Sequence, residues 1–235
     1  MQAIILAGGF GTRLKSVVQD LPKPMAPIND KPFLEYIFKY LKKQGIIKEV
    51  ILSVFYKKEV IKEYFKDSFD GINIIYNEEK EPLGTGGAIK DALKFVNNEV
   101  YVLNGDTFFD IDLKKISLKE SKICIALKQM QEFDRYGAVN IDKFGYISSF
   151  EEKAYKKQGL INGGIYLLKK DLFDDFSLIN KFSFEKFLQE NCKTLKIQTQ
   201  VFDDYFIDIG IPEDYERFVS LNNYFNNKET HVKST

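Results

Sequence analysis

A short apolar segment near the N-terminus runs straight into a glycine-rich loop, and this feature most constrains the fold. Residues 3–6 predict a strand, and glycines follow at positions 8, 9 and 11. Glycines let a backbone turn sharply and bring its N–H groups close to an anion. Arg13 and Lys23 add positive charge beside the loop. The segment therefore predicts a phosphate-binding site at the carboxyl end of a sheet strand.

Two common phosphate-binding patterns do not fit this loop. The dinucleotide pattern Gly-x-Gly-x-x-Gly fails because Leu14 stands where its third glycine should follow Gly9 and Gly11. A P-loop needs Gly-Lys-Ser or Gly-Lys-Thr, and the sequence contains neither triplet. An ordinary β-turn at Gly8 and Gly9 is a further alternative. The glycines alone therefore leave the ligand open.

The order of apolar and amphipathic runs predicts an α/β fold with a mostly parallel sheet and helices on both faces. In the first half we expect strands at Ala3–Leu6, Glu49–Val54, Ile72–Tyr76 and Val100–Leu103, and helices at Pro32–Gln44 (with Gly45 as its cap), Val60–Phe65 and Ala88–Phe95. The second half is richer in strands. There we expect strands at Ile123–Lys128, Ala138–Ile141, Tyr146–Phe150, Ile165–Leu168 and Leu195–Val201, a hairpin turn at Asp142–Gly145, and helices at Ser183–Asn191 and Pro212–Phe225.

Composition narrows the partners and the compartment. Lys and Arg total 34 and Asp and Glu total 34, so there is no basic field to bind nucleic acid or an anionic membrane. The apolar runs are only long enough for strands, and the N-terminus lacks the pattern of a signal peptide. Cys124 and Cys192 are far apart, which predicts two buried thiols in the cytoplasm. The single histidine, His231, lies in a polar tail, which argues against catalysis by histidine.

Two acidic residues are candidates for a metal site. Asp106 follows the apolar run that begins at Val100, and a carboxylate at that end of a strand is well placed to hold Mg²⁺; a turn-capping role is the alternative. Asp208 is framed by apolar residues, so we expect it to be partly buried and to need a cation or several donors. Asp110 and Asp112 match a short Asp-x-Asp metal pattern, but we expect Asp112 to cap the helical turn that follows.

A second glycine-rich run spans residues 84–87 and contains no lysine or arginine. It is poorly charged for phosphate, so we expect its backbone to approach a flat nucleobase. Thr85 could also cap the helix that begins here.

Together these segments resemble the signature of the sugar-1-phosphate nucleotidyltransferases, which make nucleotide sugars from a nucleoside triphosphate. The motifs occur in the order of that family over roughly residues 3–218: Gly8–Arg13, Pro22–Met25, Leu83–Ala88, Asn104–Asp106, Arg135–Val139, Phe150–Lys153, Ile161–Tyr166 and Asp208–Pro212. Ile211 stands where the family often has threonine.

The resemblance implies a Rossmann-like (GT-A-type) fold in one domain over residues 1–227. Its nucleotide-binding half would span about residues 1–110 and its β-rich sugar-binding half residues 111–227. From the polar sequence of the tail we expect residues 228–235 to be disordered. The resemblance also implies an in-line attack of a sugar 1-phosphate on the α-phosphate of the triphosphate, with Mg²⁺ as cofactor. Arg13, Lys23 and Lys153 would be the catalytic residues, holding the outer phosphates, the α-phosphate and the sugar phosphate respectively.

The resemblance also assigns binding residues. Nucleotide contacts are expected from Leu6, Ala7, Gly8, Gly9, Gly11, Thr12, Arg13, Lys23, Glu78, Pro82, Gly84, Thr85, Gly86 and Asp106. Contacts to the sugar phosphate are expected from Asn104, Gly137, Glu152, Lys153, Asn162 and Gly163, and metal contacts from Asp106 and Asp208.

Within the family the chain is most similar to the bacterial D-glycero-α-D-manno-heptose 1-phosphate guanylyltransferases, which implies GTP and a heptose 1-phosphate as substrates. Mannose-1-phosphate guanylyltransferases and the uridylyl-, thymidylyl- and cytidylyltransferases share the same motifs. Two other classes stay open: a non-catalytic protein that binds nucleotide sugars, and a glycosyltransferase that uses Asp110 and Asp112. The 21 Phe and 13 Tyr leave a homodimer open as well.

Overall fold

The computed structural model describes residues 1–9, 11, 14, 18 and 20–221. Within this part of the chain, none of the helices combines the length and the hydropathy that crossing a bilayer requires. Thr12, Arg13 and His231, as well as the tail 228–235, lie outside the described residues.

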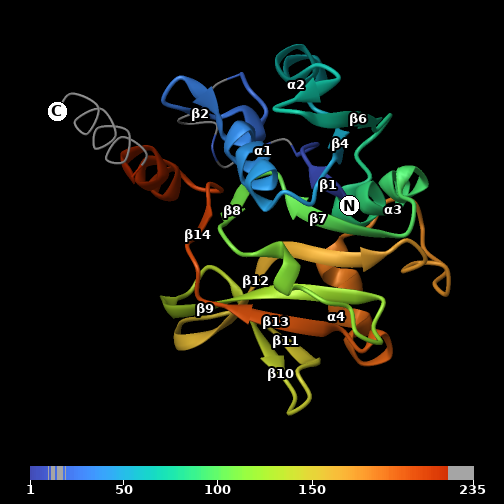
Figure 1. Cartoon of the computed structure of the whole chain (residues 1–235). Helices are drawn as coiled ribbons and strands as arrows, with labels where there is room; N and C mark the ends of the chain where they lie inside the picture. The colour runs from blue at the N-terminus through green and yellow to red at the C-terminus, as the bar shows by residue number, and fades with distance from the viewer. Residues whose placement is uncertain (10, 12–13, 15–17, 19, 222–235) are drawn as a thin grey trace.

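A parallel sheet forms the first half of the protein (Figure 1). Its strands stand in the order β7 (Glu99–Asn104), β1 (Gln2–Leu6), β4 (Glu49–Val54) and β6 (Ile72–Glu78), all parallel, and the short β5 (Ser68–Phe69) pairs antiparallel with β6. Because parallel strands end at the same edge, the segments that follow β1, β4, β6 and β7 lie along one edge of the sheet.

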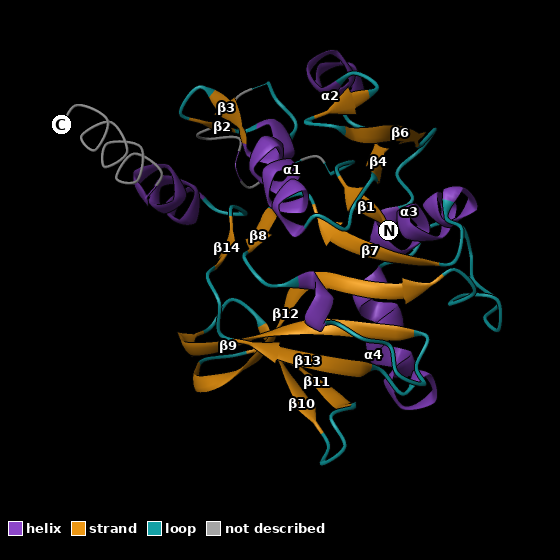
Figure 2. Ribbon diagram, in the orientation of Figure 1, coloured by secondary structure: helices purple, strands orange, loops and turns teal. Residues whose placement is uncertain are grey.

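Helices cover both faces of this sheet (Figure 2). Strand residues alternate in direction, so Ala3 and Ile5 join one core cluster while Ile4 joins the other. The first cluster includes apolar residues of α1 (Phe33–Gln44) and α2 (Lys58–Phe65), and the second includes those of α3 (Gly84–Ala92) and α4 (Phe184–Leu195). The predicted fold class is confirmed.

The second half extends the same sheet with mostly antiparallel strands. The long strand β12 (Lys156–Lys169) pairs with β7 and β10 (Gly137–Ile141), and also with β9 (Ile123–Phe133). At the edges, β11 (Ile147–Lys153) pairs with β10, and β13 (Gln198–Phe202) pairs with β9. Figure 1 shows these strands below the parallel sheet, with α4 against them.

Small elements connect and flank the sheet. Antiparallel pairs are formed by β2 (Pro27–Ile28) with β3 (Lys31–Pro32), and by β8 (Thr107–Phe109) with β14 (Phe206–Asp208). Single 3₁₀ turns lie at Lys23–Met25, Leu93–Phe95 and Leu113–Lys115. Residues 212–221 are helical at the end of the described chain.

Several local predictions are confirmed. Gly45 ends α1 in a left-handed conformation, with a φ of 72°, which a glycine adopts without strain. The predicted turn at Asp142–Gly145 is present, and the Asp142 carboxylate accepts the N–H groups of Phe144 and Tyr146. Cys124 and Cys192 are both free and buried.

Other element bounds were wrong. The strand expected from Leu195 begins only at Gln198, because Leu195 is the last residue of α4 and packs in the core. The helix expected from Ala88 begins at Gly84, so Thr85 lies inside it and is not its cap. Strand β12 begins nine residues before the expected Ile165, because its polar first half lacks the apolar pattern that predicts a strand.

Candidate active site

The first glycine-rich segment follows β1 at the ligand-binding edge of the sheet. The N–H of Ala7 donates to the Ser53 carbonyl at 2.8 Å, which ties the start of the loop to β4. Gly11 has a φ of 59°, and a Cβ there would lie 3.0 Å from the Cβ of Lys23. A side chain at Gly11 would therefore strain the backbone and press on Lys23.

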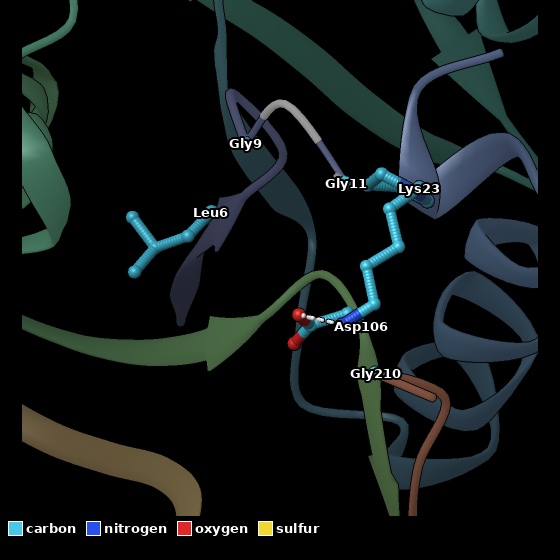
Figure 3. A pocket seen from close by; sticks show the side chains of 7 residues that line it. Leu6, Gly9, Gly11, Lys23, Asp106 and Gly210 are labelled. Atoms are coloured by element: carbon cyan, nitrogen blue, oxygen red, sulfur yellow. Dashed lines mark hydrogen bonds and ion pairs between the residues drawn. The ribbon is translucent and has the colours of Figure 1, made fainter. Parts of the chain in front are cut away.

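Lys23 lies between the two predicted metal ligands. Its ammonium Nζ is 2.6 Å from Oδ2 of Asp106 (Figure 3) and 3.6 Å from Oδ1 of Asp208. The Lys23 side chain is only 12% exposed, while the two carboxylates are 35% and 31% exposed. A weakly solvated ammonium thus faces two carboxylates that open toward solvent.

The fold brings the two acids together from distant parts of the chain. Asp106 follows β7, and Asp208 ends β14, where it pairs with Thr107 across the β8–β14 ladder. Burial and the charge of Asp106 raise the pKa of Asp208, and Lys23 and the N–H of Gly210 partly offset this. The expectation that Asp208 is partly buried is confirmed.

The donor set suits a divalent cation that also binds phosphate. Among the described residues no group of three or more His, Cys, Asp or Glu side chains could enclose a metal ion. Mg²⁺ commonly takes only one or two protein carboxylates and completes its shell with water and substrate phosphates. Asp106 and Asp208 are therefore the residues that would hold Mg²⁺, which when bound would supply positive charge beside a phosphate.

Two cavities meet at this edge. A small one of about 160 Å³ lies between Gly9, Gly11, Lys23 and Asp106. A larger one of about 460 Å³ is open to the same loop and is lined by Leu6, Gly8, Gly9, Ser53, Glu79, Pro82, Gly84, Thr85, Ala88, Asn104, Gly105, Asp106, Thr107, Glu185 and Asp208. We call the larger one the substrate cavity.

The second glycine-rich segment contributes only part of its length to the substrate cavity. Gly84 and Thr85 line it, together with Pro82 before them. A Cβ on Gly86 would lie 2.2 Å from Cε2 of Phe182, and one on Gly87 would lie 2.2 Å from the Asn180 carbonyl oxygen. These two glycines permit close packing against the segment before α4, so the expectation that Gly86 approaches a base is not supported by its position.

Glu78 is placed away from the substrate cavity, contrary to expectation. Its carboxylate pairs with Lys58 at 2.7 Å and Lys62 at 2.6 Å on α2. Glu79 faces the cavity instead, is 8% exposed, and accepts the N–H of Leu83 at 3.0 Å. Alternation along a strand explains the difference, because neighbouring residues point to opposite faces.

The residues expected to hold the sugar phosphate are not gathered in one place. Asn104 lines the substrate cavity, whereas Glu152 and Lys153 are exposed at the end of β11 and do not line it. The Asn162 amide donates to the Tyr166 hydroxyl at 2.8 Å and accepts the N–H of Gly164. Gly163 and Gly137 lie in tightly packed backbone, since a Cβ would meet the Phe109 ring and the Glu151 carbonyl respectively.

The Asp-x-Asp alternative has a simpler structural role. The Asp112 carboxylate accepts the N–H of Lys114 at 3.0 Å, which caps the 3₁₀ turn as predicted. Asp110 lies 3.8 Å from the ammonium of Lys43 at the surface.

Several cavity residues escaped the sequence analysis. Two of them could have been found from the sequence. Ser53 lies near the carboxyl end of β4, where ligand-binding residues are expected, and Glu79 follows the inward-facing Asn77 by two positions, so it is expected on the same side of the strand. Thr107 and Glu185 gave no signal, because their places depend on β8–β14 pairing and on the docking of α4.

A family model now places this geometry in context. The model described as nucleotidyl transferase matches residues 2–222. The chain belongs to this family. The match spans both glycine-rich segments, Lys23 and the two carboxylates, so the resemblance inferred from the motifs is confirmed.

Named relatives agree with this assignment. The chain is 74% identical to a D-glycero-α-D-manno-heptose 1-phosphate guanylyltransferase of Campylobacter jejuni, over 95% of this chain and 100% of that protein. It is 52% identical to an enzyme of the same name from Aneurinibacillus thermoaerophilus, over 92% and 96% of the two chains. The crystal structure of HddC from Yersinia pseudotuberculosis is similar with a TM-score of 0.82 and 41% identity, covering 93% and 98%. A second HddC structure, complexed with GMP-PN, has a TM-score of 0.80 and 39% identity, with the same coverage.

Proposed function

We propose that this protein transfers the nucleotidyl group of GTP to D-glycero-α-D-manno-heptose 1-phosphate, forming the GDP-sugar and pyrophosphate. The observation that supports the reaction type is the Lys23 ammonium between Asp106 and Asp208, beside a glycine-rich loop and a cavity of about 460 Å³. The names of the relatives at 74% and 52% identity support the two substrates.

The proposed step is a displacement at the α-phosphorus. An oxygen of the sugar phosphate attacks this atom, the bond to the oxygen that bridges to the β-phosphate breaks, and pyrophosphate leaves with that electron pair. A phosphate monoester has a second pKa of about 6, so the attacking oxygen is already deprotonated at neutral pH. The attack therefore needs no general base.

Positioning and neutralisation of charge then supply the catalysis. Lys23 would hold the α-phosphate, because its stem lies against Gly11 and it lines the smaller cavity beside Asp106. Asp106 and Asp208 would hold Mg²⁺, which when bound neutralises the charge of the phosphate oxygens. We assign the outer phosphates to Arg13 and the sugar phosphate to Lys153, because both residues lie in motifs that occur in the order of the family.

The base end of the substrate cavity suits guanine. Guanine presents two neighbouring N–H donors on its Watson–Crick edge, and one carboxylate can accept both. Glu79 offers such a carboxylate, 8% exposed and near Gly8, at the end of the cavity that Ser53 and Pro82 also line. Uracil and thymine offer a single N–H there, so Glu79 favours GTP.

The test is a comparison of nucleotides with one sugar phosphate. The purified protein is incubated with Mg²⁺, heptose 1-phosphate and GTP, CTP, UTP or dTTP in turn, and pyrophosphate release is measured. We expect release with GTP at a rate at least about tenfold above the others, as one charged hydrogen bond would give. Faster release with another nucleotide would refute the base assignment, and no release with any would support a binding protein instead.

A further inference from the structure

Glu185 is a carboxylate of the substrate cavity to which neither the catalytic step nor base recognition assigns a role. It lies in the first turn of α4 and lines the cavity together with Thr85. Its Oε2 atom accepts the Thr85 hydroxyl at 2.8 Å and the Ser183 hydroxyl at 2.7 Å. Its other oxygen, Oε1, has no hydrogen-bond partner among the described residues.

The carboxylate is held in place from two sides. The Thr85 hydroxyl oxygen accepts the N–H of Phe184 at 2.9 Å, which links α3 to the start of α4. The Ser183 hydroxyl oxygen accepts the N–H of Lys186 at 3.2 Å and so caps α4. Two hydroxyl groups that are fixed in this way orient Oε2 and leave Oε1 as the free acceptor.

The charge of Glu185 is not neutralised by a neighbouring cation. No lysine or arginine of the described residues lies within ion-pair distance of it, whereas Asp106 and Asp208 both face Lys23. A phosphate group would be repelled at this position. A hydroxyl group would be attracted, because a hydrogen bond to a charged acceptor is stronger than one between neutral groups.

Glu185 also lies near the strand that is expected to bind the sugar, because the ring of the adjacent Phe184 packs on the ring of Tyr166 with centroids 5.1 Å apart. Burial raises the pKa of the Tyr166 hydroxyl, and the negative charge of Glu185 raises it further. Tyr166 lies on β12 and accepts the amide of Asn162, a residue of the expected sugar contacts. The carboxylate is therefore placed where the base-binding segment and the sugar-binding half meet.

We propose that Glu185 accepts a hydroxyl group of the sugar 1-phosphate and determines which sugars are used. This inference rests on the proposed function, because it assumes a sugar 1-phosphate in the substrate cavity. Four carboxylates line the cavity: Glu79, Asp106, Asp208 and Glu185. With Glu79 assigned to the base and the two aspartates to the phosphate end, Glu185 is the remaining acceptor for a polyol. Glu185 makes no contact with the reacting atoms in this assignment.

The test separates sugar binding from turnover. In Glu185→Gln the size and the contacts to Thr85 and Ser183 can be kept, but the charge is lost. We expect KM for the sugar 1-phosphate to rise about 10-fold to 100-fold, as for a hydrogen bond to a charged group, with kcat and KM for GTP within about twofold. Glu190→Gln, on the same helix and with a 61% exposed side chain, is the control and should change none of these values.

A second measurement uses sugar 1-phosphates that lack one hydroxyl each. For the hydroxyl that Glu185 accepts, we expect the wild type to lose about tenfold in kcat/KM and Glu185→Gln to lose little. Equal losses for every hydroxyl in both proteins would overturn the inference. So would a rise in KM for GTP equal to that for the sugar, which would assign Glu185 to the ribose or to the packing of α3 on α4.

The failure of this inference is distinguishable from that of the proposed function. If the wild type releases no pyrophosphate from GTP and heptose 1-phosphate, the proposed function fails. Calorimetric titration of the sugar 1-phosphate into the wild type and Glu185→Gln still tests the inference then, and equal affinities, or no detectable binding to either, refute it. Normal wild-type turnover with an unchanged KM in the variant refutes only the role of Glu185.

Discussion

The two glycine-rich segments look alike in the sequence and differ in the structure. In the first, Gly9 has nothing within 4 Å of where a Cβ would lie, and it lines both cavities. In the second, Gly86 and Gly87 would place a Cβ 2.2 Å from Phe182 and from Asn180. The first segment leaves space for a ligand, whereas much of the second is filled by the chain itself.

This difference shows that a run of glycines marks close approach without saying what approaches. In the first segment the neighbour is the lysine site and the open cavity. In the second it is the segment before α4, and Gly84 is the one glycine of the second segment that lines the cavity. The cation that accompanies the first segment, and is missing from the second, was the better guide to chemistry.

We expect the largest loss of activity from substitution of Lys23, the lysine that lies beside the first glycine-rich segment. In Lys23→Met the phosphate loses a preorganised charge, so we expect kcat to fall by about 10²- to 10³-fold. Lys90→Met, an exposed lysine of α3 just after the second segment, is the matched control and should retain activity. Steady-state pyrophosphate release measures both, and similar losses in the two variants would remove the distinction between the segments.

Alanine substitutions test the glycines themselves. Gly87→Ala forces a Cβ against backbone, so we expect it to lower the free energy of unfolding by about 1–3 kcal/mol. Gly9→Ala has open space and should change stability by less than about 0.5 kcal/mol, while raising KM for the nucleotide. Urea unfolding measures the stability of both variants, and initial rates at varied nucleotide concentration measure their KM. A Gly87→Ala protein of normal stability would contradict the packing explanation.

Glu79, at the base end of the cavity, lies between the two segments, beside Gly8 and Leu83. We expect its substitution to have a smaller effect that is specific to the nucleotide. In Glu79→Gln one of the two acceptors for guanine becomes an amide donor, so we expect KM for GTP to rise about tenfold with little change in kcat. Glu81→Gln, two residues later and exposed, serves as control. The measurement is of KM and kcat for GTP at saturating sugar phosphate, and an unaffected KM would exclude Glu79 from base recognition.

The smallest effect concerns Glu78, the neighbour that points away from the cavity. Hydrogen bonds from Lys58 and Lys62 lower its pKa to about 2. A lowered pKa in the folded state stabilises the protein above the unfolded value of about 4.3, and this is lost as pH falls toward 2. We expect Glu78→Gln to be less stable than the wild type at pH 7, by well under about 1 kcal/mol because the pairs are exposed, and equally stable near pH 2. Urea unfolding across this range tests it, and a constant difference would show that the ion pairs are not its source.

Much of the fold could be predicted because its signals are local. The parallel strands are short apolar runs, α1 has the spacing of an amphipathic helix, and Gly45 ends it as expected. The errors fall where tertiary packing overrides the local pattern. The polar first half of β12 becomes a strand because β9 pairs along it, and Leu195 stays helical because it fills the core behind α4.

The candidate site also combines residues that the sequence indicates with residues that only the packing of the elements reveals. Lys23, Asp106 and Asp208 could be selected from residue type and neighbouring motif, since each follows or precedes a recognisable turn. Glu79 could be distinguished from Glu78 only by the direction of β6, which the sequence left ambiguous at the end of the strand. Glu185 could not be selected at all, because nothing near it in the chain indicates that α4 faces the cavity.

The sequence by itself determined the α/β architecture, the first glycine-rich segment with its lysine, and the membership of the nucleotidyl transferase family. These follow from periodicity, turn residues and ordered motifs, all of which are local properties of a chain. The tertiary structure alone decided that β14 pairs with β8 and so sets Asp208 beside Asp106 and Lys23. It also decided that Phe182 fills the space beside Gly86. Contacts between residues about a hundred positions apart depend on how whole elements pack, and no short stretch of sequence records that packing.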